Sequence, residues 1–390
     1  MSLAAVEAER RGFAVRVAAL FAGIFCVTGS SLPYLPIWLD WVGLTARDIA
    51  IISACPLFVR VLVSPSIAFL ADRTGDHRRL LIVLAWLALI SQLLLAQMRG
   101  FWPILLACLL LALAWTSIMP LAETIAIRGM RSLRLDYGRA RLWGSVSFTA
   151  ATLAGGWLMA HADPPLLFAL LVAGAMLLLL AAHALPATSA RLGESRGMLR
   201  VRDLAQLLRA RRFVVFLLAA GAIQAAHAAF YTFGTLHWSS LGISTSVAGL
   251  LWTVGVVAEI LVFFGSAAAI RHAGPIAILA IAAAVAILRW SAMAFDPALW
   301  LLFGLQALHG VTFGASHVGA IHFMARTVPE AQAGSAQALY AAVSSGILLG
   351  AATLLVGPLY ADYGARAYLA MAGLAAIGLL AALGLKRGDR

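Results

Sequence analysis

The segment GLTARDIAIISACPLFVRVLVSPSIAFLADRTG (residues 43–75) has a counterpart later in the chain, GISTSVAGLLWTVGVVAEILVFFGSAAAIRHAG (residues 242–274). Their alignment places Gly43 on Gly242 and Gly75 on Gly274, and each pair of glycines encloses a long apolar run. Similarity between segments so far apart indicates that the chain consists of two related halves. The fold therefore depends on the kind of element that these apolar runs form.

The composition shows that the runs are membrane spans. Hydrophobic residues make up 63% of the 390 residues and charged residues only 11%, whereas soluble domains carry about a quarter charged residues. Runs of about 20 apolar residues cross the ~30 Å hydrocarbon core of a bilayer as helices, and such runs recur along the whole chain. We therefore expect an all-α polytopic membrane protein whose constant partner is the lipid bilayer.

Twelve such helices are expected, an even number that suits two six-helix halves. The expected spans are residues 13–38, 46–70, 80–98, 101–127, 139–161, 165–185, 213–236, 245–269, 275–295, 298–324, 336–360 and 366–385. The longest polar connection, ATSARLGESRGMLRVRDLAQLLRARR (187–212), follows the sixth span. This predicts an N-terminal six-helix bundle at 1–185, a cytoplasmic linker at 186–212 and a C-terminal six-helix bundle at 213–390. Within the linker, one apolar face predicts an amphipathic surface helix and consists of Val201, Leu204, Leu207 and Leu208.

The basic residues indicate the orientation. Most of the 28 lysines and arginines lie at the termini or in loops on one side of the expected membrane. The exceptions are Arg47, Arg99 and Arg366 on the other side, and Arg60 and Arg289 within spans. Because positively charged loops stay in the cytoplasm, both termini and the linker are expected there. The net charge of +12 does not indicate nucleic-acid binding, since the basic residues are spread over short loops. No polar stretch is long enough for a soluble catalytic domain, so an enzyme is not expected.

One loop resembles a motif of the major facilitator superfamily. That motif runs G-x-x-x-D-R-x-G-R-R, and the segment IAFLADRTGDHRR (67–79) has Asp72, Arg73 and Gly75 in place, followed by a basic pair that begins at Arg78. It departs from the motif at Ala68, which stands at the first glycine position. The loop, the twelve expected helices and the internal repeat together resemble this superfamily.

Other segments narrow the resemblance to the phenylpropionate permease group, which is related to the lactose and nucleoside proton symporters. They are LDYGRARLWGSVSF (135–148), QAAHAAFYTFGTLHW (224–238), GLLWTVGVVAEILVF (249–263), LRW (288–290) and QALHGVTFGASHVGAIHF (306–323). The resemblance implies two pseudo-symmetric six-helix bundles and secondary active transport across a bacterial cytoplasmic (inner) membrane. It further implies a monomer that uses the proton as coupling ion and has no other cofactor.

Charged residues within spans are candidates for function, because a charge at the bilayer centre costs about 2.5–3.5 kcal/mol on insertion scales. The repeat aligns Arg60 with Glu259. We expect these two to act in proton coupling or substrate carboxylate binding, or alternatively to form a static ion pair. Arg289 lies near one end of its span and is expected to extend toward the membrane surface. Glu123 is expected to pair locally with Arg128 or Arg131.

Two spans carry polar stripes. Gln224, His227 and Tyr231 are three and four positions apart, and Gln306 and His309 lie on one face of a later span. His227 and His309 are predicted to relay protons or to hydrogen-bond the substrate. No cysteine or carboxylate accompanies them at ligand spacing, so no metal site is expected. The predicted substrate-binding residues are Tyr34, Trp38, Gln224, Tyr231, Trp252, Gln306 and Phe313.

The resulting hypothesis is proton-coupled uptake of a small aromatic carboxylate, such as 3-phenylpropionate, by alternating access. A sugar or nucleoside proton symporter is the main alternative, in which Gln224, Gln306 and the histidines would make neutral hydrogen bonds. A drug exporter is less favoured, because the antiporter pattern G-x-x-x-G-P-x-x-G-G is missing from the span at 139–161. A sensor or a membrane enzyme is the remaining class, and no catalytic constellation supports it.

Overall fold

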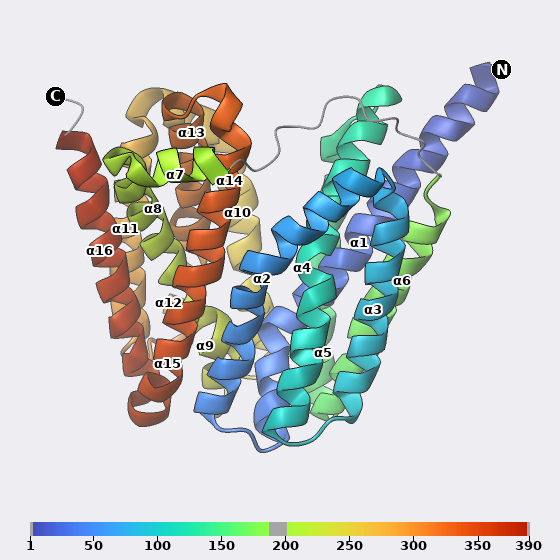
Figure 1. The fold of residues 1–390 in the computed structure, drawn as a ribbon. Coiled ribbons are helices and arrows are strands. Elements are labelled where there is room, and N and C mark those ends of the chain that lie inside the picture. Colours follow the sequence, from blue (N-terminus) through green and yellow to red (C-terminus); the bar gives the residue numbers. More distant parts are fainter. Residues whose placement is uncertain (1–2, 187–200, 388–390) are drawn as a thin grey trace. The chain divides into compact units, whose positions relative to one another are not determined.

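The computed structural model describes residues 3–186 and 201–387, and every regular element within these ranges is a helix (Figure 1). The first part of the chain forms α1 (Leu3–Trp41), α2 (Ala46–Thr74), α3 (His77–Gln97), α4 (Phe101–Ser132), α5 (Tyr137–His161), η1 (Pro164–Leu166) and α6 (Leu167–Ala184). The second part forms α7 (Val201–Arg209), α8 (Arg211–Ala225), α9 (Ala228–Ser240), α10 (Thr245–Ala273), α11 (Pro275–Met293), α12 (Leu299–Ala307), η2 (Gly310–Ala315), α13 (Ser316–Thr327), η3 (Glu330–Gln332), α14 (Ala333–Tyr340), η4 (Ala341–Leu348), α15 (Leu349–Tyr363), η5 (Gly364–Arg366) and α16 (Ala367–Arg387). The all-α class is confirmed.

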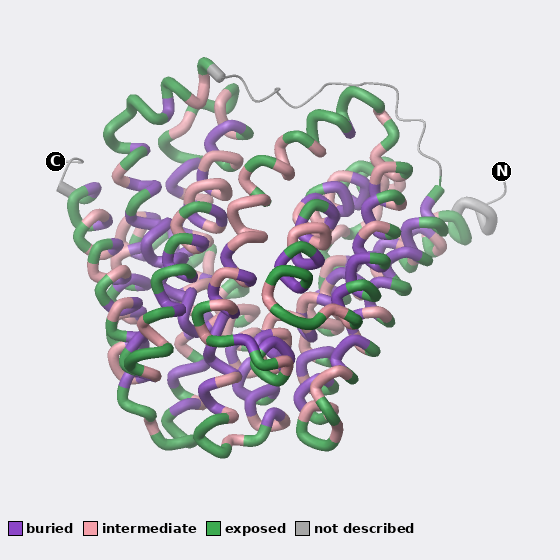
Figure 2. The backbone as a smooth tube through the Cα atoms, turned by 60° about the horizontal axis from the view of Figure 1, so that its bottom comes forward, coloured by how far each residue is buried: buried purple, intermediate pink, exposed green. Residues whose placement is uncertain are grey.

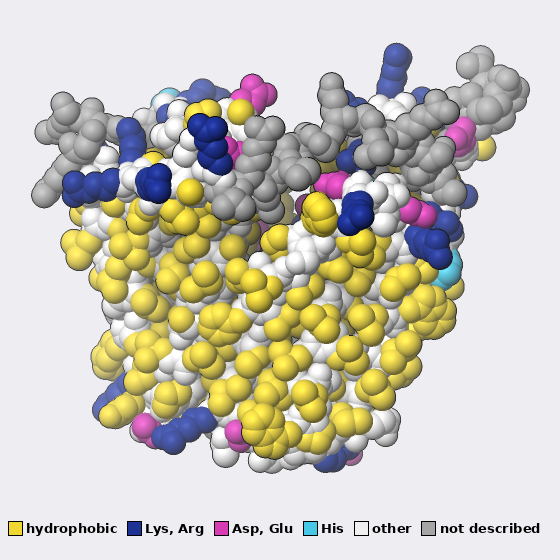
Figure 3. All heavy atoms as spheres, in the orientation of Figure 1, with side chains coloured by type: hydrophobic (Ala, Val, Ile, Leu, Met, Phe, Trp, Pro, Cys, Tyr) yellow, Lys and Arg dark blue, Asp and Glu magenta, His cyan; other side chains and the backbone are white. Residues whose placement is uncertain are grey.

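The helices are long and apolar enough to cross a membrane. In the described residues, ten segments meet that condition by length and composition. One of them, Glu330–Lys386, covers two expected spans that are separated by a turn at Gly364, and α5 covers another without being among the ten. Twelve spans are therefore consistent with the structure. Figure 3 shows hydrophobic side chains over most of the visible face, with Lys and Arg side chains gathered toward two opposite edges.

The internal repeat has a clear structural counterpart in α2 and α10. Both helices are 29 residues long. Each is flanked by the aligned glycines, and all four adopt positive φ: +87° at Gly43, +69° at Gly75, +80° at Gly242 and +77° at Gly274. Glycine enters this region at little cost because it has no Cβ. The repeat therefore preserves the turns at both ends of the helix as well as the apolar run between them.

The described helices group into two compact units, and neither is continuous in sequence. Unit 1 comprises Met1–Leu44, Leu62–Ser195 and Ser244–Gly249, and unit 2 comprises Thr45–Val61, Arg196–Ile243 and Leu250–Arg390. The first part of α2 thus belongs to the unit that holds most of the second half of the chain, and the start of α10 belongs to the other. A division of the chain at the linker alone would instead leave all of α2 in the first unit and all of α10 in the second.

Small residues explain these two exchanged segments. In unit 2, a Cβ on Gly357 of α15 would lie 2.5 Å from the Cβ of Ala50 in α2, and a Cβ on Gly350 would lie 2.9 Å from the ring of Phe58. In unit 1, Thr245 Oγ1 donates a hydrogen bond to Gly156 O of α5 at 2.8 Å. Such contacts let helix backbones approach closely, which is how helices associate where lipid removes the hydrophobic driving force.

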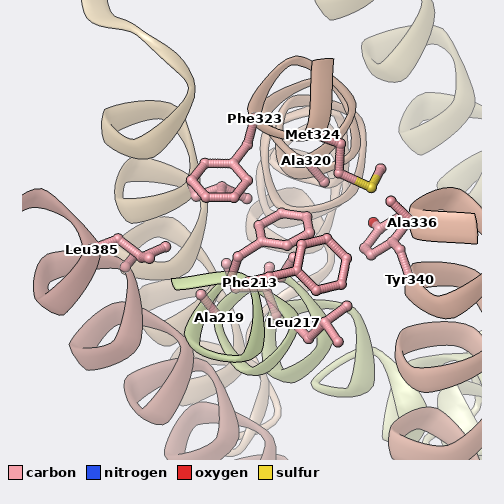
Figure 4. Packing of buried hydrophobic residues seen from close by; sticks show 14 of the residues in the cluster. Phe213, Leu217, Ala219, Ala320, Phe323, Met324, Ala336, Tyr340 and Leu385 are labelled. Carbon is pink, nitrogen blue, oxygen red and sulfur yellow. The ribbon is translucent and has the colours of Figure 1, made fainter. Parts of the chain in front are cut away.

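The predicted linker contains one described helix. Residues 187–200 lie outside the described residues, and the predicted amphipathic helix is α7. Leu207 is buried in an apolar cluster of unit 2, part of which Figure 4 shows around Phe213, Phe323 and Tyr340. Leu208, however, is 51% exposed and does not share the buried face, since it is rotated about 100° from Leu207 around the helix. Figure 2 shows the alternation of buried and exposed turns along the other helices.

Candidate functional site

The α8–α9 span of unit 2 is interrupted at Ala226 and His227. An interruption frees backbone carbonyls, and the His227 imidazole meets two of them: Nδ1 lies 3.1 Å from Ile223 O and 3.3 Å from Gln224 O. Because a carbonyl only accepts hydrogen bonds, we assign the proton to Nδ1, which leaves Nε2 to face the neighbouring helix. The break therefore sets the orientation of the imidazole.

The neighbouring segment is η2, a π-helical stretch between α12 and α13. Such stretches are rare and occur frequently at functional sites. Two glycines bring η2 against α10: a Cβ on Gly310 would lie 2.5 Å from Ala258 O, and a Cβ on Gly314 would lie 3.3 Å from Glu259 Cγ. The stretch places Thr312 opposite His227, with Thr312 Oγ1 at 3.2 Å from His227 Nε2.

Arg289 of α11 lies at the centre of this arrangement and is completely buried. Its Nη1 donates hydrogen bonds to Thr312 Oγ1 at 3.0 Å and to His309 Nδ1 at 3.2 Å. Its Nη2 donates to Gln306 Oε1 at 2.9 Å. In the part of the chain that the structure describes, no Asp or Glu forms an ion pair with Arg289. The guanidinium is therefore held by neutral acceptors alone.

Aromatic rings complete the environment of this cation. The guanidinium carbon lies 4.4 Å from the centroid of the Trp290 ring and 5.1 Å from that of Phe230, at cation–π distance. Phe230 is stacked on Trp252 of α10 at 4.4 Å, and Tyr231 is stacked on the His227 ring at 5.5 Å. The faces of these rings stabilise the Arg289 charge through cation–π contacts and contribute apolar surface around it.

Several polar atoms around Arg289 remain without hydrogen-bond partners in the described residues. They are Arg289 Nε, Gln306 Nε2, Trp290 Nε1 and the hydroxyl of Tyr368 in α16, and all four are buried. Buried donors without partners are uncommon in proteins and cost about 1–3 kcal/mol each. Their concentration beside a buried cation marks a place that favours a hydrogen-bond acceptor, and most of all an anionic one.

The structure brings together seven of the residues singled out from the sequence, although it does not test their roles. Those in this part of unit 2 are Gln224, His227, Tyr231, Trp252, Gln306, His309 and Phe313. The His227 and His309 rings are 5.4 Å apart, and the His309 ring is stacked on Phe313 at 5.3 Å. Gln224 Nε2 donates to Ser316 Oγ at 3.2 Å. Helices far apart in the sequence thus supply one cluster.

The two aromatic residues predicted on the first span lie in unit 1, where both are fully buried. The hydroxyl of Tyr34 donates to Thr152 O in α5 at 2.6 Å. The Trp38 ring packs edge-on against Phe168 of α6 at 4.9 Å. Both side chains therefore hold helices of unit 1 together. Their predicted contact with substrate stays a prediction.

The aligned charges Arg60 and Glu259 both belong to unit 2. Glu259 of α10 is partly buried beside Gly314 of η2, and it interacts electrostatically with Tyr231. Arg60 of α2 is exposed. The arginine at the centre of the polar cluster is thus Arg289, contrary to the expectation that it extends toward the membrane surface. That expectation failed because α11 turns Arg289 onto the face that packs inside unit 2.

The other sequence-derived residues lie in unit 1. Asp72 Oδ1 is 3.4 Å from His77 Nε2. Arg78 Nη2 donates to His183 O at 2.7 Å, which ties the start of α3 to the end of α6. Arg73 is exposed beside Gly75. Glu123 interacts with Arg141 of α5 rather than with the two arginines expected on its own helix.

The sequence also contained a signal for the burial of Arg289 that the expectation did not use. Ala282 and Ala286 precede Arg289 at seven and three positions, on the same face of α11, and both are buried. Small residues on one face of a membrane helix indicate close helix packing. A charge on that face is enclosed by protein. Thr312 was visible in the sequence on the polar face that also carries Gln306 and His309. Trp290 and Tyr368 gave no comparable signal, because each is an ordinary residue of an apolar span.

Comparison with known proteins identifies the family. The family model described as the MFS_1 like family matches residues 15–370, which is most of the chain. The chain belongs to this family. It is a multi-pass membrane transporter of the major facilitator type, and it is not an enzyme.

Individual relatives of the transporter differ in what they carry. It is 32% identical over 354 residues to a protein of Escherichia coli (strain K12) described as "Probable 3-phenylpropionic acid transporter", covering 88% of this chain and 90% of that one. It is 28% identical to the maltose permease of Geobacillus stearothermophilus, covering 94% and 93%. The crystal structure of the nucleoside transporter NupG matches with a TM-score of 0.84 at 19% identity over 96% of this chain and 99% of that one, which shows the shared fold.

Proposed function

We propose that this transporter carries out proton-coupled uptake of a small aromatic carboxylate, such as 3-phenylpropionate, by alternating access. We further propose that it works in a bacterial cytoplasmic (inner) membrane with both termini in the cytoplasm. The observation that carries the proposal is Arg289, a buried cation that neutral acceptors and aromatic rings surround. A permanent charge in such surroundings is costly unless an anion offsets it during the transport cycle.

The unpartnered donors support a carboxylate as that anion. Arg289 Nε and Gln306 Nε2 each offer a hydrogen that no acceptor of the described residues takes up. A carboxylate has two oxygens with about four lone pairs and can accept from both donors at once. The aromatic side chains near Arg289, including Phe230 and Trp252, suit the phenyl ring of such a substrate. The name of the Escherichia coli relative supports the same substrate class.

Coupling to protons would follow from electrostatics at the same cluster. His227 and His309 stand beside Arg289, where a second positive charge is repelled. A substrate carboxylate bound at Arg289 offsets that repulsion, so the anion and a proton on either histidine favour each other's binding. By linkage this effect is reciprocal, as symport requires. Glu259 is the further candidate for proton exchange, and Arg60 is a second candidate for substrate carboxylate binding or for an ion pair with Glu259.

The test is uptake into proteoliposomes under an imposed inward proton gradient. Labelled 3-phenylpropionate should accumulate in wild-type vesicles, and unlabelled aromatic acids should compete, whereas sugars and nucleosides should not. Arg289→Lys keeps the charge but loses the planar guanidinium, so we expect at least a tenfold rise in KM, which corresponds to about 1.4 kcal/mol. Arg326→Gln, which changes an exposed arginine, is the control and should retain uptake.

Uptake into the same vesicles tests the roles of Glu259 and Arg289. Glu259→Gln should lower proton-driven accumulation if this carboxylate exchanges the coupling proton. Accumulation with undiminished dependence on the gradient would remove Glu259 from the mechanism. Unchanged transport by Arg289→Lys together with Arg289→Gln would refute the role of Arg289 as the cation for the substrate.

A neutral sugar or nucleoside is the second candidate cargo. Its support is the resemblance to the maltose permease and to NupG, together with Gln224 and Gln306 in the polar cluster. Competition by maltose or by nucleosides, without competition by aromatic acids, would select it over the carboxylate.

A further inference from the structure

A second group of titratable side chains lies in unit 2, away from the hydrogen bonds of Arg289. His237 is in the last turn of α9, Asp296 is in the loop between α11 and α12, and Tyr360 is in α15. His237 Nε2 is 2.6 Å from Asp296 Oδ1, and His237 Nδ1 is 3.1 Å from the hydroxyl of Tyr360. Both ring nitrogens are therefore engaged, each by a group that can exchange a proton.

The three side chains connect solvent to the interior. The Asp296 side chain is 47% exposed, whereas that of His237 is 10% exposed. Asp296 adopts a φ of +48°, a left-handed conformation that few residues other than Gly, Asn and Asp adopt. The loop thus holds a solvent-accessible carboxylate against a nearly buried imidazole.

Tyr368 of α16 extends this group inward. It is 1% exposed, and its hydroxyl has no hydrogen-bond partner in the described residues. Its ring is stacked on Trp290 at 5.7 Å, and its hydroxyl lies within electrostatic range of Tyr360, Arg289 and Asp296. Tyr368 is therefore close to both the exposed carboxylate and the buried cation.

The Tyr368 hydroxyl lies beside one face of α9 and of the residue before it, His227. His227, Phe230, Gly234 and His237 follow one another at three or four positions, so they share a helix face. The two histidines are about 15 Å apart along the axis, and Gly234 lies about 4.5 Å before His237. A Cβ on Gly234 would be 3.6 Å from the Tyr368 oxygen. This is an ordinary van der Waals distance, so the Tyr368 hydroxyl lies next to Gly234, one turn before His237.

We propose that Asp296, His237, Tyr360 and Tyr368 form a proton route between solvent and the histidines beside Arg289. This inference rests on the proposed proton coupling. Asp296 takes up a proton and passes it to His237 Nε2, and Nδ1 releases one to the Tyr360 hydroxyl. Tyr360 and Tyr368 each accept one proton and release another toward His309 or His227. The transfer leaves the His237 proton on Nε2 instead of Nδ1, and the imidazole and the hydroxyls turn back before the next transfer. One proton then enters for each one delivered.

Water completes the inner part of the route. A buried water needs two to four polar partners, and the Tyr368 hydroxyl and Trp290 Nε1 are both unpartnered in the described residues. The charge of Arg289 repels a proton that arrives without an anion, which would prevent a leak in the absence of substrate. The route and the substrate site would thus be coupled through one residue.

The test compares two assays of the purified transporter in proteoliposomes. Accumulation of labelled substrate under a proton gradient requires proton movement, whereas counterflow at equal pH does not require net proton movement. Asp296→Asn and Tyr360→Phe should lower accumulation at least tenfold and leave counterflow within twofold of wild type. Tyr363→Phe, which changes an exposed tyrosine, should leave both unchanged. An entrapped pH dye should show a matching loss of substrate-induced proton entry.

Undiminished accumulation by Asp296→Asn and Tyr360→Phe would overturn the route. An equal loss of accumulation and counterflow would also overturn it, because that result indicates a structural role. Tyr360→Phe keeps the ring that stacks on Phe233 at 4.3 Å, so it is the variant best able to fold. Absence of proton-driven uptake in the wild type would instead refute the proposed function, and the two failures are therefore distinguishable.

Discussion

Thr312 has one hydrogen to donate and two neighbours that can accept it. Its hydroxyl lies 3.2 Å from His227 Nε2 and 3.5 Å from His309 O, while it accepts from Arg289 Nη1 at 3.0 Å. With His227 protonated only on Nδ1, the hydrogen goes to Nε2. If Nε2 gains a proton and becomes a donor, the hydroxyl must turn toward His309 O. A single hydroxyl thus adapts to either state of His227.

Thr312→Val tests this hydroxyl, because the two side chains have nearly the same shape. Removing the oxygen leaves Arg289 Nη1 with one acceptor fewer, and a buried group that loses its partner costs about 1–3 kcal/mol. We expect a lower Tm in detergent and weaker proton-driven uptake. Thr312→Ser keeps the hydroxyl and should retain uptake. A Thr312→Val variant with wild-type Tm and uptake would contradict the assignment.

At the scale of elements, the contact of α2 with α15 depends on small residues. Gly357 faces Ala50, and an added Cβ would lie 2.5 Å from the Ala50 Cβ, a distance that real side chains do not adopt. Gly346 and Gly350 face Val61 and Phe58 in the same way. The helices are therefore matched surface to surface, and a single added methyl group must push them apart.

Gly357→Ala should destabilise unit 2 by about 1–3 kcal/mol, the usual cost of overpacking a tight contact. Ala50→Gly removes the opposing methyl group, so the double variant should regain most of the lost stability. Thermal unfolding of the wild type, the two single variants and the double variant measures the coupling energy between Gly357 and Ala50. Gly373→Ala is the matched control, since nothing lies within 4 Å of a Cβ at that position. Additive losses in the double variant would argue against the direct contact.

At the scale of the whole molecule, the proposed cargo determines which driving force counts. A monovalent carboxylate that moves with one proton carries no net charge across the membrane. A pH difference of one unit then supplies about 1.4 kcal/mol, or about tenfold accumulation. The membrane potential supplies about 2.3 kcal/mol per 100 mV only for each net charge that moves.

Uptake of 3-phenylpropionate should therefore follow the pH gradient and hardly respond to a potential imposed alone. Proteoliposomes with a valinomycin-driven potassium potential, at equal pH inside and outside, measure the effect of the membrane potential separately. Strong uptake under potential alone would indicate a second proton or a neutral cargo. A sodium gradient serves as the control and should have no effect.

The sequence by itself determined the architecture. The apolar runs require helices, because backbone groups in lipid have no other partners. The aligned glycines of 43–75 and 242–274 required two related halves, and all four have the positive φ that glycine permits. The polar stripes of Gln224, His227, Gln306 and His309 were visible as well, since a polar residue in an apolar span is conspicuous on its own.

Only the tertiary structure decided which side chains meet. A span shows which residues share its face, but the helix that covers that face is set by packing between segments far apart in the sequence. Arg289 was therefore expected at the membrane surface, whereas α11 turns it into unit 2. Packing between distant segments also explains why Tyr34 and Trp38 make their contacts with α5 and α6 of unit 1. The energy of a buried charge depends on its distances to groups on other helices. The sequence of a single helix does not give those distances.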